Sequence, residues 1–569
     1  MTTTEPERRL FVRQASGLVR EVSVTNALFF NTAAFIGTGL GWYPVLYTLA
    51  LVPIGVAGFT TYGWAAIICG AFCVVLALIF ASLASVMPRS GGDYVFTSRL
   101  IPRAGPFIGW LESFTLVFAS LAIVAFEVPI VLRNLQITGR IVGIGTGWGF
   151  FEDANKWFAK GGVITGVPGF IGALLVLGVI FAIVVQPTRR LHRIVTGLAA
   201  FGLCCAFLMF VFGLLLGSSG DFARHLPKHA DGTTVAALRS AASKNGVVGS
   251  GIDFHPAVFG LVSSVVIFNY IGFQYSAYIA GEVRGNVRRG VLIAVLGALG
   301  IAVLFNSVYT DLLARHYGVT AQLGWGSQFW LGDAKLPLGQ PGSLPLVAAI
   351  STSGAWPLWA LISLGATLFP LLLCPVYFNF ISRVVLAWSL DRQVPAWFGE
   401  VNERLRAPLR AILVAVGIAV LLALLQNFAL LPHKLAPPEG KLNLAATAWF
   451  SIALALLTWV MPGVNAIAGR FTRPDLMRRA PGAALLPVFG AVWLVFAVAL
   501  YWFGTIKPIK SSLSSLGGQQ SSFDYLNSSG LTFAIAIVVI GVLIYVVQAL
   551  RNRAQGVDRA LMFREIPPD

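Results

Sequence analysis

The sequence contains little charge, since only 11% of its 569 residues are Asp, Glu, Lys or Arg. Soluble globular proteins carry about a quarter charged residues. The stretch from Val22 to Pro88 has no acidic residue, basic residue or histidine over 67 positions. This length is enough for two helices that each cross a bilayer with roughly 20 residues. The composition therefore excludes a water-soluble enzyme and predicts an integral membrane protein.

Cysteine and histidine are also rare, with five and six residues. The cysteines all lie in apolar segments and the histidines at segment ends or in polar loops, so neither a disulfide framework nor a metal-ligand spacing is indicated. The apolar runs contain no HExxH, GxSxG or phosphate-cradling pattern, which argues against an enzyme, and no cofactor is expected. No apolar core precedes the first long run, so we expect a retained first helix rather than a cleaved signal peptide.

Long apolar runs separated by polar or Gly/Pro-rich breaks predict twelve transmembrane helices, because such runs are too long and too evenly apolar for a transmembrane barrel. The runs lie at about 23–50, 60–86, 105–132, 166–186, 194–217, 256–281, 290–314, 356–387, 408–431, 443–468, 483–505 and 530–549. The predicted units are an N-terminal segment (1–22), five helices (23–217), an external loop (218–255), five more helices (256–468), two final helices (469–550) and a tail (551–569).

The basic residues predict the orientation. If the N-terminus is cytoplasmic, that side holds 26 of the 40 basic residues, all of them arginine, and the other side holds five arginines and all nine lysines. Positive residues favour the cytoplasmic side of short loops. We therefore expect both termini in the cytoplasm and the chain in the plasma membrane. The positions of the charges, which sum to +17, indicate how the chain is oriented in the membrane. We therefore expect the protein to contact lipid, and we expect neither a nucleic acid nor an obligate protein partner.

The first apolar run contains three alternating glycines, at Gly37, Gly39 and Gly41. Each weakens a helix by about 1 kcal/mol relative to alanine. A break at this point frees backbone N–H groups that a ligand, protein or water must satisfy. Close packing of helices on small residues is the alternative, although glycines on a packing face would be four residues apart.

The sixth run contains polar and aromatic residues around Gly272, at a depth where polar groups are costly unless they line a cavity. Two interrupted helices five spans apart are typical of inverted-repeat transporters. The N-terminal end of a half-helix attracts an anion, and freed carbonyls at a C-terminal end accept from a cation. An α-amino acid carries both groups on one carbon.

Four stretches make the chain resemble the amino acid–polyamine–organocation transporters from about residue 16 to residue 482. They are 36–40 (IGTGL), 88–94 (PRSGGDY) with 109–110 (GW), 270–274 (YIGFQ) with 281–283 (GEV), and Arg383 with 389–395 (SLDRQVP). The resemblance implies an all-α fold of twelve helices shared with the sodium-coupled leucine transporters, in which helices 1 and 6 are discontinuous.

The resemblance also implies a substrate site near the bilayer midplane. Gly37, Thr38 and Gly39 would hold the substrate carboxylate, carbonyls near Ile36 and in 268–271 would hold the ammonium group, and Phe268 would be an aromatic lid or, alternatively, a packed core residue. The implied substrate-binding residues are Ile36, Gly37, Thr38, Gly39, Phe268, Asn269, Tyr270, Ile271 and Gly272.

The chain departs from the family where several members carry titratable groups, because Ala199, Gln274 and Ser82 stand at those positions. A sodium site would need oxygen ligands from helix 8. Thr367 and Ser363 are the hydroxyl groups available there, toward the outer half of the span.

Glu112 and Glu127 are the carboxylates that we place within the spans. On an ideal helix they are ~22 Å apart along the axis and about 60° apart around it, so both can face the bundle. Burial favours the neutral form of a carboxyl group, which makes both residues candidates for proton coupling. The alternative is that each lies near a membrane face and forms structural hydrogen bonds.

Four loop charges, Glu282, Arg288, Arg383 and Asp391, lie at the cytoplasmic ends of helices 6 and 8. Ion pairs between them would hold an inner gate shut, but exposed pairs contribute less than about 1 kcal/mol. The positive-inside pattern alone also explains the arginines.

The sequence thus predicts a secondary transporter for an amino acid or related amine that works by alternating access, with a proton as the favoured coupling ion. No carboxylate lies in either break, which favours a neutral substrate. An exchanger and a sodium symporter remain alternatives, and a channel or membrane-embedded enzyme is disfavoured.

Overall fold

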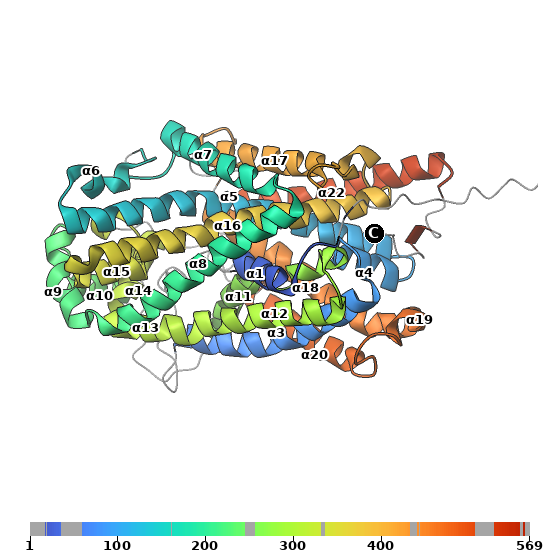
Figure 1. The fold of residues 1–569 in the computed structure, drawn as a ribbon, viewed down its shortest axis with the longest axis horizontal. Helices are drawn as coiled ribbons and strands as arrows, with labels where there is room; N and C mark the ends of the chain where they lie inside the picture. The colour runs from blue at the N-terminus through green and yellow to red at the C-terminus, as the bar shows by residue number, and fades with distance from the viewer. Residues whose placement is uncertain are drawn as a thin grey trace, which may run out of the picture.

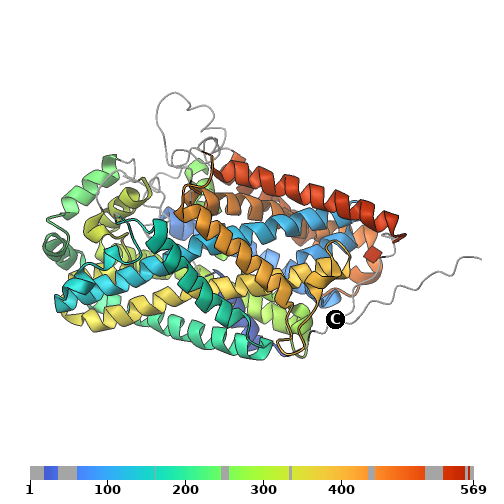
Figure 2. The same cartoon turned by 90° about the horizontal axis from the view of Figure 1, so that it is seen from above.

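The computed structural model describes residues 18, 20–35, 60–160, 162–244, 256–331, 336–432, 441–442, 444–506, 529–557 and 562–563. Regular structure in these residues is helical, with isolated β-bridges and no strand. The long helices run side by side along the long axis of the molecule (Figure 1), and the view from above shows the same bundle (Figure 2). Eight described helices are long and apolar enough to cross a membrane. The prediction of an all-α, multi-pass membrane protein is confirmed.

A helix lies in each of the twelve predicted spans. These helices are α1 (Val24–Phe35), α3 (Thr61–Val86), α5 (Gly105–Thr146), α7 (Gly166–Val184), α8 (Thr188–Leu215), α11 (Pro256–Tyr270), α12 (Val287–Leu304), α16 (Trp356–Leu390), α17 (Leu409–Asn427), α18 (Leu444–Thr472), α20 (Leu486–Tyr501) and α22 (Ser529–Ala554). Residues 36–59, which contain the predicted break at Ile36, Gly37, Thr38 and Gly39, lie outside the described residues.

Shorter helices cover the two ends of the bundle. They are α4 (Asp93–Leu100), α6 (Gly149–Glu152), α9 (Ser219–His229), α10 (Val235–Lys244), the π-helical turn η5 (Phe305–Tyr309), α13 (Thr310–Tyr317), α14 (Val319–Leu331), α15 (Leu344–Ser351) and α19 (Pro474–Met477). The predicted loop 218–255 thus contains two helices, of which α9 packs on α15 and α10 on α14. These four lie at one end and α4 and α19 at the other (Figure 1). The end with α4 and α19 carries most arginines and is called the arginine-rich end below.

Helices α5 and α16 form the centre of the bundle, since they pack on each other and most of their residues are buried. Helix α5 begins with Pro106 in its first turn and ends at Gly147, which is left-handed with φ 70°. Its 42 residues span about 63 Å, roughly twice the thickness of the hydrocarbon layer. The peripheral helix α22 instead exposes apolar residues such as Val539 and Leu543 on a face suited to lipid.

Helices α18 and α20 approach closely at a pair of glycines. A Cβ atom at Gly490 would lie 2.7 Å from the carbonyl oxygen of Gly463. Small residues at such crossings let membrane helices pack by van der Waals contact.

We expect Gly490→Val to push α18 and α20 apart and to lower the free energy of unfolding by about 1–3 kcal/mol, as overpacking commonly does. Thermal unfolding in detergent measures this loss. The control is Gly417→Val, because a Cβ atom at Gly417 meets nothing within 4 Å. An equal loss of stability in the two variants would contradict the packing role.

Candidate functional site

Helix 6 is interrupted. Helix α11 ends at Tyr270, and the chain continues as turns and the 3-10 segments η3 (Tyr275–Ala277) and η4 (Ala280–Glu282). Gly272 has φ +108°, a conformation that residues with a Cβ atom rarely adopt. The Gly272 N–H donates to the Gln274 side chain at 3.3 Å and the Phe273 N–H to the Tyr270 carbonyl at 3.2 Å. The i→i−4 pattern of the helix therefore stops here.

The interruption lies directly against the last described turn of α1. A Cβ atom at Gly272 would be 2.5 Å from the Cβ atom of Ala34. Asn31 on α1 donates to the Ser276 hydroxyl at 3.0 Å and accepts from the Ser276 N–H at 2.7 Å. The turn after α11 is thus tied to α1 just before the chain enters residues 36–39.

The described part of the predicted substrate site is buried, and two of its side chains bond toward α3. Asn269 donates to the Tyr62 hydroxyl at 2.7 Å, and the Tyr270 hydroxyl donates to the Ala66 carbonyl at 2.8 Å. Ile271 is also buried. The side chain of Phe268 lies outside the described residues, as do Ile36, Gly37, Thr38 and Gly39.

The sequence interpretation missed a polar network beside this interruption. The Tyr62 hydroxyl donates to Asn306 Oδ1 at 2.6 Å, and Asn306 lies in the π-helical turn η5. Such π-turns are frequent at functional sites. The available signal was Asn306, the single asparagine of its apolar run, because an amide at that depth needs a partner.

At the arginine-rich end, one buried ion pair joins the segment after the interruption to α16. Arg383 donates to both carboxylate oxygens of Glu282, at 2.8 and 3.0 Å, and both side chains are almost fully buried. The backbone beside Glu282 bonds the segment before α1, since the Val22 N–H donates to the Glu282 carbonyl at 2.9 Å. Helices 1, 6 and 8 therefore meet at this pair.

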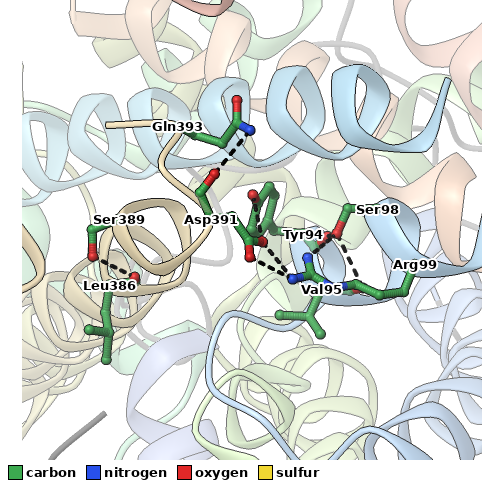
Figure 3. A network of polar contacts seen from close by, with 8 residues as sticks. All are labelled: Tyr94, Val95, Ser98, Arg99, Leu386, Ser389, Asp391 and Gln393. Carbon is green, nitrogen blue, oxygen red and sulfur yellow. Dashed lines mark hydrogen bonds and ion pairs between the residues drawn. The ribbon is translucent and has the colours of Figure 1, made fainter. Parts of the chain in front are cut away.

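A second buried ion pair joins α4 to the end of α16 (Figure 3). Arg99 lies 2.6 Å from Asp391 Oδ2, and neither side chain is exposed. The Tyr94 hydroxyl donates to the same carboxylate at 2.9 Å, while Gln393 donates to the Asp391 backbone carbonyl at 3.3 Å. Figure 3 shows Tyr94 and Arg99 both pointing from α4 toward Asp391.

These contacts correct the view of the loop charges as exposed. Glu282, Arg383 and Asp391 are buried, and the partner of Asp391 is Arg99 rather than one of the other three predicted residues. Arg288 is exposed and forms no ion pair with a described residue. Breaking a buried ion pair is strongly destabilising, whereas breaking an exposed pair is not.

Glu112 and Glu127 are both buried on α5, facing the bundle as their helical spacing predicts. Glu127 lies near the middle of the 42-residue helix. Both of its carboxyl oxygens lack a hydrogen-bond partner, and it is close enough to Cys374 and Tyr377 of α16 to interact with them electrostatically. Glu112 accepts from Thr97 at 2.7 Å.

A further carboxyl group, Asp93, begins α4 and accepts a hydrogen bond from Tyr278. Gly92, with φ +50°, permits this contact, because a side chain there would overlap the Tyr278 ring. Burial raises the pKa of Asp93 to about 7, while the hydrogen bond from Tyr278 acts in the opposite direction. Asp93 lies in the PRSGGDY stretch, which the sequence interpretation used only for the family resemblance.

The candidate cation ligands are engaged elsewhere in the described structure. The Thr367 hydroxyl donates to the Ser363 carbonyl at 2.9 Å, and the Ser363 hydroxyl lies 2.8 Å from the Thr138 hydroxyl of α5. Both residues are buried between α16 and α5. Within the described ranges, no group of three or more His, Cys, Asp or Glu residues is suited to hold a metal ion.

An interrupted helix 6 that meets α1 inside a bundle of membrane-spanning helices is typical of carrier-type membrane proteins. The sequence matches the amino acid permease family over residues 24–517, and the chain belongs to that family. This membership agrees with the superfamily that the sequence motifs indicate.

Individual relatives are distant. The chain is 21% identical to the aspartate-proton symporter of Bacillus subtilis over 85% of this chain and 79% of the relative. It is 25% identical to the vacuolar cationic amino acid transporter 4 of Arabidopsis thaliana over 72% of this chain and 59% of the relative. An uncharacterized transporter of Rhizobium meliloti is 28% identical over 31% of this chain and 35% of its own length.

We expect Asp391→Asn to lower the free energy of unfolding by about 3–5 kcal/mol, because it leaves the Arg99 guanidinium buried without its carboxylate. Denaturation in detergent micelles measures the change. Asp475→Asn is the control: it breaks the pair with Arg473 on the surface, which is worth less than about 1 kcal/mol. A small, equal effect of both substitutions would show that burial of the Arg99 pair has no energetic consequence.

Proposed function

We propose that this protein is a secondary transporter that carries an amino acid into the cell by proton-coupled symport. The observation that supports this most is the contact of the helix 6 interruption with the last described turn of α1. In inverted-repeat transporters such paired interruptions form the substrate site. The repeats would be residues 23–217 and 256–468, with both termini in the cytoplasm and the chain in the plasma membrane.

The substrate site would comprise Ile36, Gly37, Thr38 and Gly39 from helix 1 and residues 268–272 from helix 6. Backbone N–H groups of the first set would hold the carboxylate, and backbone carbonyls of both sets the ammonium group. The segment 268–281 carries no acidic residue, which favours a neutral side chain over a cationic one. A related amine is the alternative substrate.

A proton is the favoured coupling ion. Glu127 is a buried carboxyl group without a hydrogen-bond partner in the middle of the most central helix, and Glu112 is a second candidate. The Bacillus relative named as an aspartate-proton symporter adds support. Sodium coupling through Ser363 and Thr367 is less favoured, because both hydroxyls already have protein partners. Exchange of one amino acid for another remains the other alternative.

The arginine-rich end would be the cytoplasmic gate. The pair Arg383–Glu282 joins helix 8 to helix 6, and the pair Arg99–Asp391 joins α4 to helix 8. Opening of the site toward the cytoplasm would therefore have to break these pairs or move the paired elements together. Substrate can drive this change only through different affinities for the outward, occluded and inward states.

The test of function is a thermal-shift screen of the purified protein against the common amino acids and polyamines, in sodium and sodium-free buffers at two pH values. Ligand binding to the folded state raises its stability by mass action. Counterflow in proteoliposomes then separates a carrier, whose flux saturates, from a channel. Formation of a new product would indicate an enzyme instead.

We expect Gly39→Val to abolish the thermal shift caused by substrate and to leave the protein folded, because a branched side chain would block the backbone groups proposed to hold the carboxylate. Gly417→Val, in open space on α17, is the matched control and should keep the shift. Unchanged binding by Gly39→Val would refute the assignment of the carboxylate site.

We expect Glu127→Gln to remove the dependence of uptake on external pH, because the amide cannot gain or lose a proton near neutral pH. Initial rates in proteoliposomes at several external pH values measure this. Glu403→Gln, at an exposed loop position, is the control. Persisting proton-driven uptake in Glu127→Gln would exclude the residue as the coupling group.

A further inference from the structure

A series of buried polar side chains passes along the helix 6 interruption from the middle of α5 to the arginine-rich end. Glu127 is followed by Tyr377 on α16, with which it interacts. The ring centroid of Tyr377 is 5.3 Å from that of Tyr275, which is 5.6 Å from that of Tyr278. Tyr278 then donates to Asp93. All five residues are buried.

Asp93 has a second buried carboxyl group beside it. Glu112 of α5 is close enough to Asp93 for their charges to interact. Each accepts one hydroxyl hydrogen bond, from Tyr278 and Thr97 respectively, and each has a second carboxyl oxygen without a partner. The side chain of Asn465 donates to the Thr97 hydroxyl at 2.8 Å, which orients it toward Glu112.

No cation compensates these two groups in the described part of the chain. The arginines at this end that are buried, Arg99 and Arg383, are bonded to Asp391 and Glu282. The other titratable groups that act on Asp93 are tyrosines of the segment after α11. Two adjacent carboxylates in a low-dielectric site cannot both stay ionised without compensation. A proton held between the two groups would relieve this cost.

Tyr275 supplies an independent observation. Its hydroxyl is fully buried and makes no well-formed hydrogen bond, although it lies beside the hydroxyls of Ser120 and Tyr377. A hydroxyl group both donates and accepts, so the Tyr275 hydroxyl can take a proton from one neighbour and give one to another.

We propose that Asp93 and Glu112 share one proton at the cytoplasmic end of the transport path, and that Tyr278, Tyr275 and Tyr377 connect this pair to Glu127. The inference rests on the proposed proton coupling. A proton that enters at Glu127 leaves from the pair, and each tyrosine gives its hydroxyl proton to one neighbour and receives one from the other, so its own protonation is unchanged at the end. Because Tyr278 belongs to the segment after the interruption, proton release would be linked to movement of helix 6.

The proposal can be tested in proteoliposomes with a labelled mixture of L-leucine, L-aspartate and L-arginine, with the membrane potential clamped at zero. For one proton per substrate, an inward gradient of one pH unit should give about tenfold accumulation by the unmodified protein. Asp93→Asn and Glu112→Gln should lose this accumulation while counterflow stays measurable. Tyr275→Phe should slow proton-driven uptake more than counterflow, and Asp475→Asn on the surface is the control.

The outcomes separate this proposal from the proposed function. If the unmodified protein shows counterflow but no response to the pH gradient, proton coupling itself is wrong. If it responds and Asp93→Asn and Glu112→Gln respond equally well, the function stands and the shared-proton site is overturned.

A stability measurement tests the site without transport. Because the pKa of Asp93 is raised from 3.8 to about 7 in the folded protein, the folded state binds more protons than the unfolded state between these values, so stability falls as pH rises through this window. Asp93→Asn should flatten this part of the profile, and Asp93→Glu should restore it.

If the variants do not fold, infrared spectra of the unmodified protein decide: a protonated carboxyl band that titrates near neutral pH supports the shared proton, and its absence overturns it.

Discussion

A polar group inside a bilayer has to find its partner within the protein, because hydrocarbon offers no hydrogen bonds. This constraint governs the region around the helix 6 interruption. The chain leaves the α-helix at Tyr270, and four polar side chains around this point bond another element: Tyr270 bonds α3, Ser276 bonds α1, Tyr278 bonds α4 and Glu282 bonds α16. A stretch that would be unstable alone is held by four neighbours.

The same constraint explains the two ion pairs at the arginine-rich end. Buried pairs stabilise a fold poorly compared with apolar side chains of similar volume, but they are costly to break from one side. Arg99–Asp391 and Arg383–Glu282 place this cost at the points where α4 and the segment after α11 meet α16. The pairs therefore favour the observed arrangement of these elements.

Much of the fold was readable from the sequence because lipid imposes a simple pattern. All twelve apolar runs contain helices, and most begin within a few residues of the expected position. Helix α5 continues to Thr146, beyond the apolar run predicted at about 105–132, because a helix can extend past its apolar part. Asp311 was overlooked because it stands near the end of an apolar run. Its carboxylate accepts from the Thr60 N–H and hydroxyl, both at 2.6 Å, and so completes the first turn of α3.

The partners within the candidate site were not readable, for a physical reason. The position of Gly272 indicated where helix 6 stops, because a local backbone preference decides it. The choice of Arg99 for Asp391, or of Tyr278 for Asp93, depends on how distant helices pack, and no local pattern encodes it. Since the segment after the interruption bonds three other elements, its displacement cannot be confined to helix 6. Any movement that opens the arginine-rich end must break or carry along its contacts with α1, α4 and α16, so the proposed substrate site and the proposed gate would share one moving part.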